Sequence, residues 1–302
     1  MANWDEILFE ISEYEKSDVN RFDMVRRKYL KKLFEYTKRN VIIYYSGWLQ
    51  KGHMKEIEVN DNDKNGFMTV IHNLDHSIGL DLILHTPGGG AAATESIVDY
   101  LHSIFGNNIR AFIPQLAMSA GTMIACSCKE IFMGMHSSLG PIDPQIDGMP
   151  AHGILEEFKK AYEQIKDDND KLYVWQPIIS KYNPTLIGEC EKAIAWSKEI
   201  VEKWLVNCMF KDEQDKENKA KKIVVELSDH SKTKSHSRHL SSSFCRDKLG
   251  LKIEPLEKDK YLQDLVLSVH YACIHTLSTT GAIKIIENHN GKAFIHMMKP
   301  KK

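Results

Sequence analysis

The sequence predicts an α/β fold built on a parallel β-sheet, and three observations support this prediction. Short apolar runs rich in β-branched residues alternate with amphipathic segments from residue 40 onward, and strands that alternate with helices usually pair in parallel. The stretch "LILHTPGGGAAATESIVDYL" (82–101) contains one such unit, with glycines between its strand and its helix. The chain has 302 residues, of which 42% are hydrophobic, so it can bury a sizeable core.

The elements follow from local pattern, taken in chain order. Residues 5–39 place apolar side chains at helical spacing, with Leu30, Leu33 and Phe34 as one possible stripe. The stretch "NVIIYYSGWL" (40–49) is rich in β-branched and aromatic residues, which predicts a strand. The following region predicts strands at 80–85, 109–114 and 130–133, a helix at 91–105 and an apolar segment of small residues at 119–128.

The second half of the chain is expected to be mainly helical. Residues 151–210 have helical patterning, and "KDEQDKENKAKK" (211–222) is typical of a charged helix end or linker. We expect a capped helix after "HLSSS" (239–243) and an apolar helix at about 259–279.

Charge and hydropathy exclude several classes of protein. Lys and Arg together number 40 and Asp and Glu 41, giving a net charge of −1, so no global field attracts nucleic acid or an anionic membrane. The acidic N-terminal stretch lacks the basic start and apolar core of a signal peptide. No stretch approaches the ~20 apolar residues of a membrane span. We expect a cytoplasmic protein that binds no nucleic acid and has no membrane span.

Cysteine and histidine spacing gives no reason to expect a metal. The six cysteines are scattered through a chain without an export signal, which favours reduced thiols. Cys126 and Cys128 are too close for the usual zinc-knuckle spacing. His230, His236 and His239 form a cluster that could ligate a metal, but no carboxylate or cysteine completes a set at familiar spacing. We therefore predict no metal and no cofactor.

The three glycines Gly88, Gly89 and Gly90 indicate close approach to the backbone or a positive φ. A phosphate site would require a P-loop lysine after the glycines or the pattern G-x-G-x-x-G, and both are absent. The remaining interpretation is an oxyanion site, which needs a nucleophile from elsewhere in the chain.

Ser119 is the candidate nucleophile. In "QLAMSAGTMIACS" (115–127) it follows a predicted strand and precedes a run of small residues, which places it near a helix N-terminus. Free N–H groups and the helix dipole favour developing negative charge there. A serine at this position can instead simply cap the helix. The segment alone leaves both interpretations open.

Three ordered segments make a resemblance specific: "LILHTPGGG", "AMSAGTMIA" about thirty residues later, and "MGMHSSLGPIDPQI". Together they resemble the Clp-fold serine peptidases, most closely the serine dehydrogenase proteinase (SDH) family related to signal peptide peptidase A. The similarity extends over about residues 40–295, including "HSRHLSSSFCRDKLGLKI" (236–253), and residues 1–39 carry no recognisable match.

The resemblance implies a Clp/crotonase-like spiral of ββα units with added N- and C-terminal helices. Residues 1–39 would form an N-terminal helical extension and residues 40–210 the Clp-fold peptidase core. Residues 211–302 would form a charged linker and a C-terminal helical part of the same domain. The resemblance also implies oligomeric assembly and peptide-bond hydrolysis through an acyl-enzyme.

Site residues are carried over from the family by position. Ser119 corresponds to the nucleophile. Gly89, with Gly88 or Gly90 beside it, and Ala120 would offer backbone N–H groups to the oxyanion. The glycines would then let substrate lie against the strand end while an N–H points at its carbonyl oxygen.

The general base is the least determined residue. Clp proteolytic subunits use a histidine 25 residues after the serine, but Pro144 stands there, and neither Ile142 nor Asp143 beside it is a histidine. His136 follows the serine by 17 residues, in a loop that frames the site in this family. A Ser-His-Asp triad with the Clp spacing is therefore not expected.

Signal peptide peptidase A and its relatives use a lysine roughly 40 to 50 residues after the serine. Lys166, in "QIKDDND", lies 47 residues after Ser119, and Lys159, Lys160 and Lys171 are rivals in the same window. A lysine acts as base only when desolvation or a neighbouring cation lowers its pKa. Lys166 can also be an ordinary exposed lysine at a helix end.

The function expected is that of an ATP-independent or partner-fed serine peptidase with a Ser119–Lys166 dyad. Its partners would be a peptide or unfolded protein substrate and further copies of the chain. A protein that delivers substrate would be a further partner, because no nucleotide motif is present. Two alternatives stay open. One is an oligomeric binding scaffold with an incomplete dyad. The other is a crotonase-type acyl-CoA enzyme, whose chemistry would not need the serine.

Overall fold

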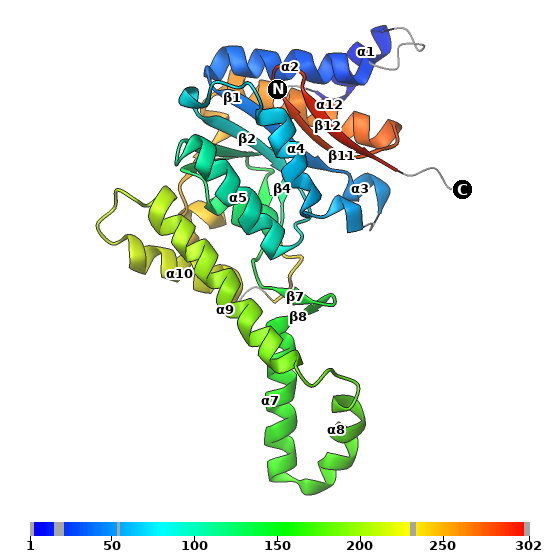
Figure 1. The fold of residues 1–302 in the computed structure, drawn as a ribbon, viewed down its shortest axis with the longest axis vertical. Helices are drawn as coiled ribbons and strands as arrows, with labels where there is room; N and C mark the ends of the chain where they lie inside the picture. Colours follow the sequence, from blue (N-terminus) through cyan, green and yellow to red (C-terminus); the bar gives the residue numbers. More distant parts are fainter. Residues whose placement is uncertain (1–2, 15–20, 53–54, 230–233, 299–302) are drawn as a thin grey trace.

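A seven-stranded sheet forms the centre of the molecule (Figure 1). The structure is a computed structural model that describes residues 3–14, 21–52, 55–229 and 234–298. The strand order is β10-β5-β3-β2-β1-β11-β12, in which β11 pairs antiparallel with both β1 and β12 and the other neighbours pair in parallel. The α/β prediction is thus confirmed. The strands are β1 (Asn40–Ser46), β2 (Leu80–His85), β3 (Ile109–Ile113), β5 (Glu130–Met133), β10 (Ile253–Pro255), β11 (Ala282–Asn288) and β12 (Ala293–Met297).

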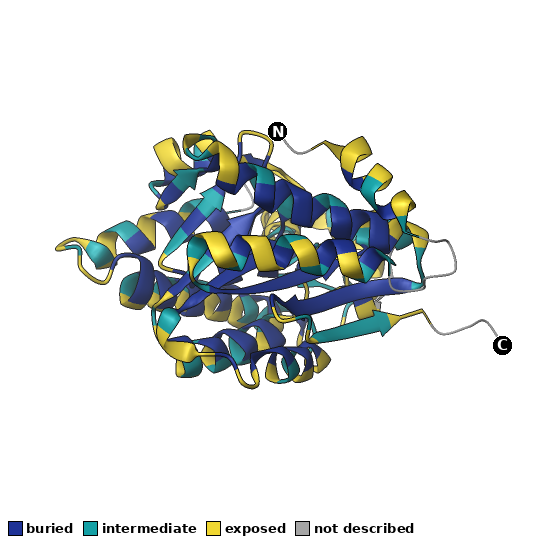
Figure 2. Ribbon diagram, turned by 90° about the horizontal axis from the view of Figure 1, so that it is seen from above, coloured by how far each residue is buried: buried dark blue, intermediate teal, exposed yellow. Residues whose placement is uncertain are grey.

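Helices cover both faces of this sheet, which explains the continuous apolar runs of its central strands. All residues of β1 and β2 are buried, as expected for strands packed on two sides. One face carries α4 (Asn62–Ile71), α5 (Ala91–Phe105), α6 (Ala120–Cys126), the end of α9 (Leu186–Trp204) and α10 (Lys216–Ser228). The other carries α1 (Trp4–Glu13), α2 (Arg21–Thr37) and α12 (Lys260–Thr279). Seen from above, the helices turn buried positions inward and exposed positions outward (Figure 2).

Short elements connect these layers. They are α3 (Trp48–Lys51), η1 (Lys55–Ile57), η2 (His76–Ile78), η4 (Leu205–Met209), η5 (Phe244–Leu249) and η6 (Leu256–Lys258). Within the described ranges, no helix is both long enough and apolar enough to cross a membrane.

The N-terminal helices belong to the core. Leu30 and Leu33 of α2 are fully buried against the sheet and α12, which confirms them as the apolar stripe. Phe34 stacks on His289 with ring centroids 4.0 Å apart. Helix α2 therefore contributes side chains to the main core.

The C-terminal part is helical only in part, because residues 282–297 form the hairpin of β11 and β12. β11 pairs with β1 inside the sheet. The pattern of β11, "AIKIIEN", interrupts its apolar residues with Lys284 and Glu287, and both are buried. Those two charges hide a fully buried strand from a search based on hydrophobic pattern.

A helical arm extends from the body (Figure 1). It consists of α7 (Ala151–Asp167), η3 (Asn169–Lys171), α8 (Leu172–Ile179) and the first part of α9. A small core of its own includes Ile154, Leu186 and Ile194, whereas α8 has no buried residue. The predicted helical region at 151–210 is confirmed, although its pattern did not predict that it leaves the body.

Two small sheets lie between the main sheet and the arm. One has the order β4-β6-β9 and the other is the hairpin β7-β8, which leads into α7. Their strands are β4 (Leu116–Ala117), β6 (Ser138–Leu139), β9 (Leu240–Ser241), β7 (Gln145–Ile146) and β8 (Met149–Pro150).

Candidate active site

Ser119 lies at a strained turn between β4 and α6. Its φ of 49° and ψ of −113° are unusual for a residue with a side chain. Ser119 is the N-cap residue of α6, but its hydroxyl makes no capping hydrogen bond. The residue is partly exposed, whereas every residue of α6 is buried. Such strain costs on the order of 1–3 kcal/mol and persists only where the surroundings enforce it.

Hydrogen bonds on both sides hold this turn in place. Met118 N donates to Thr86 O at 3.0 Å, which joins β4 to the end of β2. The buried Thr122 hydroxyl donates to Ala117 O at 2.8 Å and accepts from Gly140 N at 2.9 Å. A single side chain therefore connects β4, α6 and the segment after β6.

Gly88 is required for the close approach of two backbones. Its φ is +103°, and a Cβ placed on it would lie 2.6 Å from Ser119 Cβ and 3.0 Å from Ala120 N. Any side chain at this position would displace Ser119. The predicted need for glycine after the strand is thus explained at this residue by contact with the candidate nucleophile.

Two backbone N–H groups lie free beside Ser119. Val59 N donates to Gly88 O at 2.8 Å, and Gly90 N donates to Val59 O at 2.9 Å. Backbone groups alternate in direction along an extended segment, so Gly89 directs its N–H away from Val59, to the edge that β4 borders. Among the described residues, neither Gly89 N nor Ala120 N donates a backbone hydrogen bond. Ala120 is buried, where unpaired N–H groups are rare, whereas Gly89 is exposed and its N–H can reach solvent.

The three glycines are not equivalent. Gly89 has a φ of +153°, and a Cβ there would overlap the backbone of Val59. Gly90 has an ordinary φ of −65°, and the nearest atom to its Cβ would be Val59 O at 3.6 Å. The structure therefore requires glycine at positions 88 and 89 and leaves room for a methyl group at 90.

A buried carboxylate and a histidine are joined by a hydrogen bond in the segments next to β6 and β9. His236 Nδ1 lies 2.9 Å from Asp143 Oδ1, and the Asp143 side chain is fully buried. Gln145 Nε2 donates to the second carboxylate oxygen at 3.1 Å. When Nδ1 donates its proton to the carboxylate, Nε2 of the imidazole is left as the basic nitrogen.

Strand register carries this pair to the same end of the small sheet as Ser119. Ala117 of β4 pairs with Leu139 of β6, and Leu139 pairs with Leu240 of β9. Ser119 and Asp143 come after β4 and β6, and His236 comes before the antiparallel strand β9, so all three residues leave the same end of this sheet. A Cβ on Gly140 would lie 3.2 Å from Met118 Cα, so the two segments are in contact next to the serine.

Reasoning from the sequence missed this pair. Asp143 was considered only as a position that lacks histidine, and His236 only as a possible metal ligand. The two residues are 93 positions apart, beyond any local motif. The chain order Ser, Asp, His, which α/β-hydrolases also use, is the signal that could have found them. His230 lies outside the described residues, and the described residues contain no group of three His, Cys, Asp or Glu suited to a metal.

The structure does not bring Lys166 to Ser119 within one chain. Lys166 is exposed in the last turn of α7, about 22 Å beyond Ala151 at ~1.5 Å per residue. Lys159 and Lys160 lie on the same helix, 3.9 Å from Glu163 and 3.6 Å from Glu157 respectively. The fourth lysine of the sequence window, Lys171, is in η3 beyond the end of α7.

Beneath the site lies a buried cluster of polar aromatic side chains. His85, the last residue of β2, contacts Gln115 Oε1 through Nε2 at 3.0 Å, and Tyr45 Oη lies 3.2 Å from His270 Nδ1. Burial lowers the pKa of His85 to about 4, so it is neutral at physiological pH. His136, the alternative base considered from sequence, is exposed in the loop after β5.

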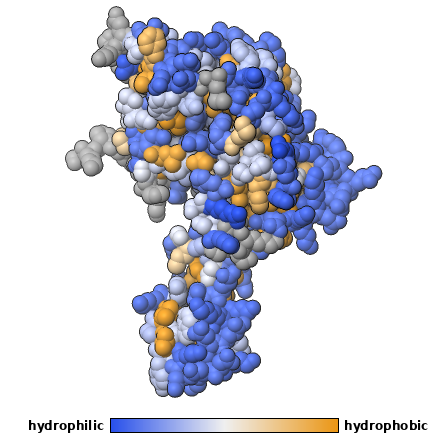
Figure 3. Space-filling model, turned by 180° about the vertical axis from the view of Figure 1, so that it is seen from behind, coloured by the Kyte–Doolittle hydropathy of each residue, from blue (hydrophilic) through white to orange (hydrophobic). Residues whose placement is uncertain are grey.

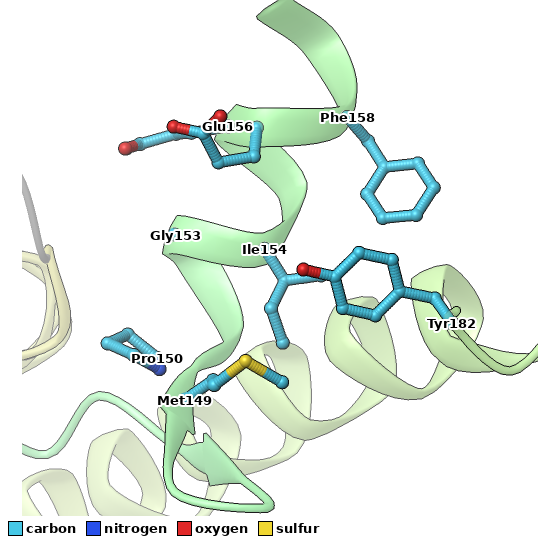
Figure 4. Close-up of a pocket in the computed structure, with 8 residues that line it drawn as sticks. Met149, Pro150, Gly153, Ile154, Glu156, Phe158 and Tyr182 are labelled. Carbon is cyan, nitrogen blue, oxygen red and sulfur yellow. The ribbon is translucent and has the colours of Figure 1, made fainter. Parts of the chain in front are cut away.

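A groove of about 380 Å³ opens at the base of the arm. Figure 4 shows the rings of Phe158 and Tyr182 beside Ile154, with Met149 below them. The groove begins at Met149 in the β7-β8 hairpin. The same hairpin contains Gln145, which donates a hydrogen bond to Asp143. The lining residues are Met149, Pro150, Gly153, Ile154, Glu156, Glu157, Phe158 and Tyr182.

The chain matches the family described as ClpP-like SDH-type serine proteinase over residues 7–263. It is 32% identical over 199 residues to an uncharacterized protein of Methanocaldococcus jannaschii, a match that covers 66% of this chain and 59% of the relative. A second uncharacterized protein of that organism is 37% identical over 89 residues, which cover 30% of this chain and 31% of the relative. No solved structure matches the chain.

The family match corrects one prediction. Residues 1–39 were expected to lie outside the resemblance, but the match begins at residue 7. Helix α2, which lies within the match, supplies buried side chains to the main core.

Alanine substitutions should separate the glycines. Gly89→Ala should lower the free energy of unfolding by about 1–3 kcal/mol, because the methyl group overlaps Val59 and the φ is strained. Gly90→Ala should be neutral or stabilise by about 0.4–1 kcal/mol, because its conformation suits alanine. Urea titrations of both variants measure this. Equal losses in the two variants would contradict the assigned backbone geometry.

His85 should make stability depend on pH. The unfolded imidazole titrates near ~6.5, whereas burial holds the pKa of folded His85 at about 4. The unfolded chain therefore binds more protons as pH falls from about 6.5 to 4, and stability falls with it. This group should account for a loss of about 2 kcal/mol between pH 7 and pH 5.

The measurement is urea unfolding at pH 7, 6 and 5. His85→Gln should reduce the pH slope, and His136→Gln, at an exposed position, should leave it unchanged. Identical slopes for the wild type and His85→Gln would show that His85 is not held neutral by burial.

Proposed function

Because this chain belongs to the ClpP-like SDH-type serine proteinase family, we propose that it hydrolyses peptide bonds through an acyl-enzyme on Ser119. One observation carries the proposal: a strained serine at a backbone contact, with two unpaired N–H groups and a buried aspartate that hydrogen-bonds a partly exposed histidine at the same end of one small sheet. Each part corresponds to a role in acyl transfer.

Gly89 and Ala120 have the role of oxyanion donors. Attack of Ser119 Oγ on the substrate carbonyl carbon moves negative charge onto the carbonyl oxygen. Backbone N–H groups that are already oriented stabilise that charge without reorganisation. The hydrogen bonds that fix the two backbones are support for this assignment, because they leave these N–H groups available.

His236 and Asp143 have the role of base and orienting acid. Nε2 of His236 takes the proton from Ser119 Oγ as the new C–O bond forms, and later gives it to the leaving amine as the C–N bond breaks. Water then attacks the acyl carbon and loses a proton to His236, which gives that proton to Ser119 Oγ as the ester C–O bond breaks and the acid product leaves. Asp143 holds the imidazole in the required tautomer.

Lys166 stays a second candidate for the base. It could serve Ser119 only from the arm of a neighbouring copy, and its amine would have to be neutral in that environment. Both alternatives use the same nucleophile and the same oxyanion donors, so they differ only in which residue acts as the general base.

The substrate proposed is an extended peptide or an unfolded protein. On the side opposite Val59, the Gly88–Gly90 segment offers the C=O group of Gly89 to the substrate backbone, while the Gly89 N–H serves the oxyanion. An extended chain that pairs with such an edge gains main-chain hydrogen bonds whatever its sequence. The sequence has no nucleotide motif, so unfolding of a folded substrate would depend on a partner that delivers it.

Homo-oligomeric assembly is proposed from the arm. Helix α8 is apolar and has no buried residue, and Tyr173 and Val174 are 77% and 62% exposed. The view from behind shows apolar side chains on the surface of the arm (Figure 3). Contact with another copy would remove this apolar surface from water, and such assemblies are usually closed and symmetric.

Labelling with a fluorophosphonate should identify the nucleophile and the base. Ser119→Ala should abolish labelling and peptide hydrolysis. His236→Gln should lower kcat/KM by on the order of 10²- to 10⁴-fold, because a positioned general base is lost. Lys166→Ala and the control His239→Gln, at a neighbouring histidine, should stay active.

Three other outcomes would change the assignment. An active His236→Gln and an inactive Lys166→Ala would replace the Asp143–His236 pair by the lysine base. A folded wild-type protein that neither labels nor cleaves peptides would favour the binding scaffold. Hydrolysis of acyl-CoA by a Ser119→Ala variant would favour the crotonase-type enzyme.

Light scattering should show assemblies heavier than the 34.7 kDa chain. Replacing Tyr173 and Val174 together by Glu should shift them to smaller species, because the apolar contact is lost. Lys181→Glu changes an exposed charge next to α8 and should leave the assembly intact. A wild-type monomer at micromolar concentration would contradict the proposal.

A further inference from the structure

A buried ion pair lies on the far side of the Val59 segment from the glycines. Lys284 of β11 and Asp63 of α4 are 1% and 0% exposed in their side chains, with Nζ 2.7 Å from Oδ1. Burial lowers the pKa of Lys284, and the charge of Asp63 opposes that shift. A buried ion pair is often no more stabilising than an apolar pair of the same size, so its value here has to be sought in what it positions.

The pair grips the backbone on both sides of Val59. Lys284 Nζ donates to Glu58 O at 2.8 Å, and Asn60 N donates to Asp63 Oδ2 at 3.0 Å. Tyr44 in β1 donates its hydroxyl to the same carboxylate at 2.7 Å. The cation thus holds the residue before Val59, and the carboxylate holds the residue after it.

The Val59 segment has little other regular structure to fix it. It follows η1 and joins the rest of the fold through an isolated bridge to Gly89. Ser46 at the end of β1 donates its hydroxyl to Ile57 O. In turn, Val59 makes both hydrogen bonds that orient Gly89, through Gly88 O and Gly90 N.

We propose that Lys284 and Asp63 are positioning residues for the peptidase site: they hold Val59 so that Gly89 keeps its N–H directed at the oxyanion. The inference rests on the proposed function and extends it to residues that do not touch substrate. A displaced donor weakens the transition state more than the bound ground state, so kcat should change and KM should not.

The same strand supplies a matched control. Glu287, three residues along β11, forms an equally buried ion pair with Arg26 on the face covered by α2. That pair has no hydrogen bond to the segment 57–60 among the described residues. Removing either pair as a double neutral variant avoids leaving one buried charge uncompensated.

The experiment compares Asp63→Asn/Lys284→Met with Arg26→Met/Glu287→Gln. In the first variant, kcat and the rate of fluorophosphonate labelling should both fall by on the order of 10²-fold, with KM within threefold. In the second, both rates should stay within threefold per folded molecule even where the urea midpoint falls. Asp63→Asn alone should retain more activity than Lys284→Met alone, because it keeps the Nζ bond to Glu58 O.

Equal kcat and labelling rates in the two double variants, per folded molecule, would overturn the proposal. Hydrogen exchange separates this failure from failure of the peptidase assignment. If the wild type neither labels nor cleaves, the proposed function fails. Exchange of the backbone amides in 86–95 then still tests the clamp, by which we mean the hold of the Lys284–Asp63 pair on Val59. Faster exchange only in Asp63→Asn/Lys284→Met supports the clamp, and unchanged exchange rejects it.

Discussion

The approach of the backbone at Gly88 to the backbone at Ser119 is the constraint on which the rest of the site depends. A Cβ between them would lie 2.6 Å from Ser119 Cβ, so the contact exists only because position 88 has no side chain. Parallel strands bring both segments to the same sheet edge, since β2 and β3 end side by side there. The sheet therefore brings the two segments to the same edge, and the glycine at position 88 lets their backbones approach to contact distance.

The fold surrounds this contact with hydrogen bonds that leave selected groups unpaired. Val59 forms hydrogen bonds with the C=O of Gly88 and the N–H of Gly90. The Thr122 hydroxyl connects the residue Ala117, before Ser119, to the segment after β6. What remains is an N–H at Gly89, an N–H at Ala120 and a serine hydroxyl that caps nothing. Of these three residues only Ala120 is buried, so the neighbouring hydrogen bonds have to compensate for its unpaired N–H and for the strained backbone of Ser119.

The parts of the site that could be predicted from sequence are those with a local signal. Gly88, Gly89 and Ser119 stand in short segments whose composition shows a close backbone approach and a helix start. Asp143 and His236 have no such signal. They are 93 positions apart, and the pairing of the two-residue strands β6 and β9 brings them together. Lys284 was missed for a related reason: a lysine in an apolar strand looks like an exposed position until its carboxylate partner is known.

The arm is a second feature that sequence pattern predicts only in part, and it is continuous in sequence with Asp143. Its helical periodicity was predictable, but periodicity does not tell whether a helix packs on the sheet or leaves it. The hairpin β7-β8 connects Asp143 to α7 within a few residues, and α9 returns to the main core through Val201 and Trp204. Both ends of the arm are therefore anchored, one of them beside the Asp143–His236 pair, while the exposed helix α8 lies at its tip. An assembly contact at α8 would thus act on a segment continuous with Asp143, whereas α1 and α2 cover the opposite side of the sheet.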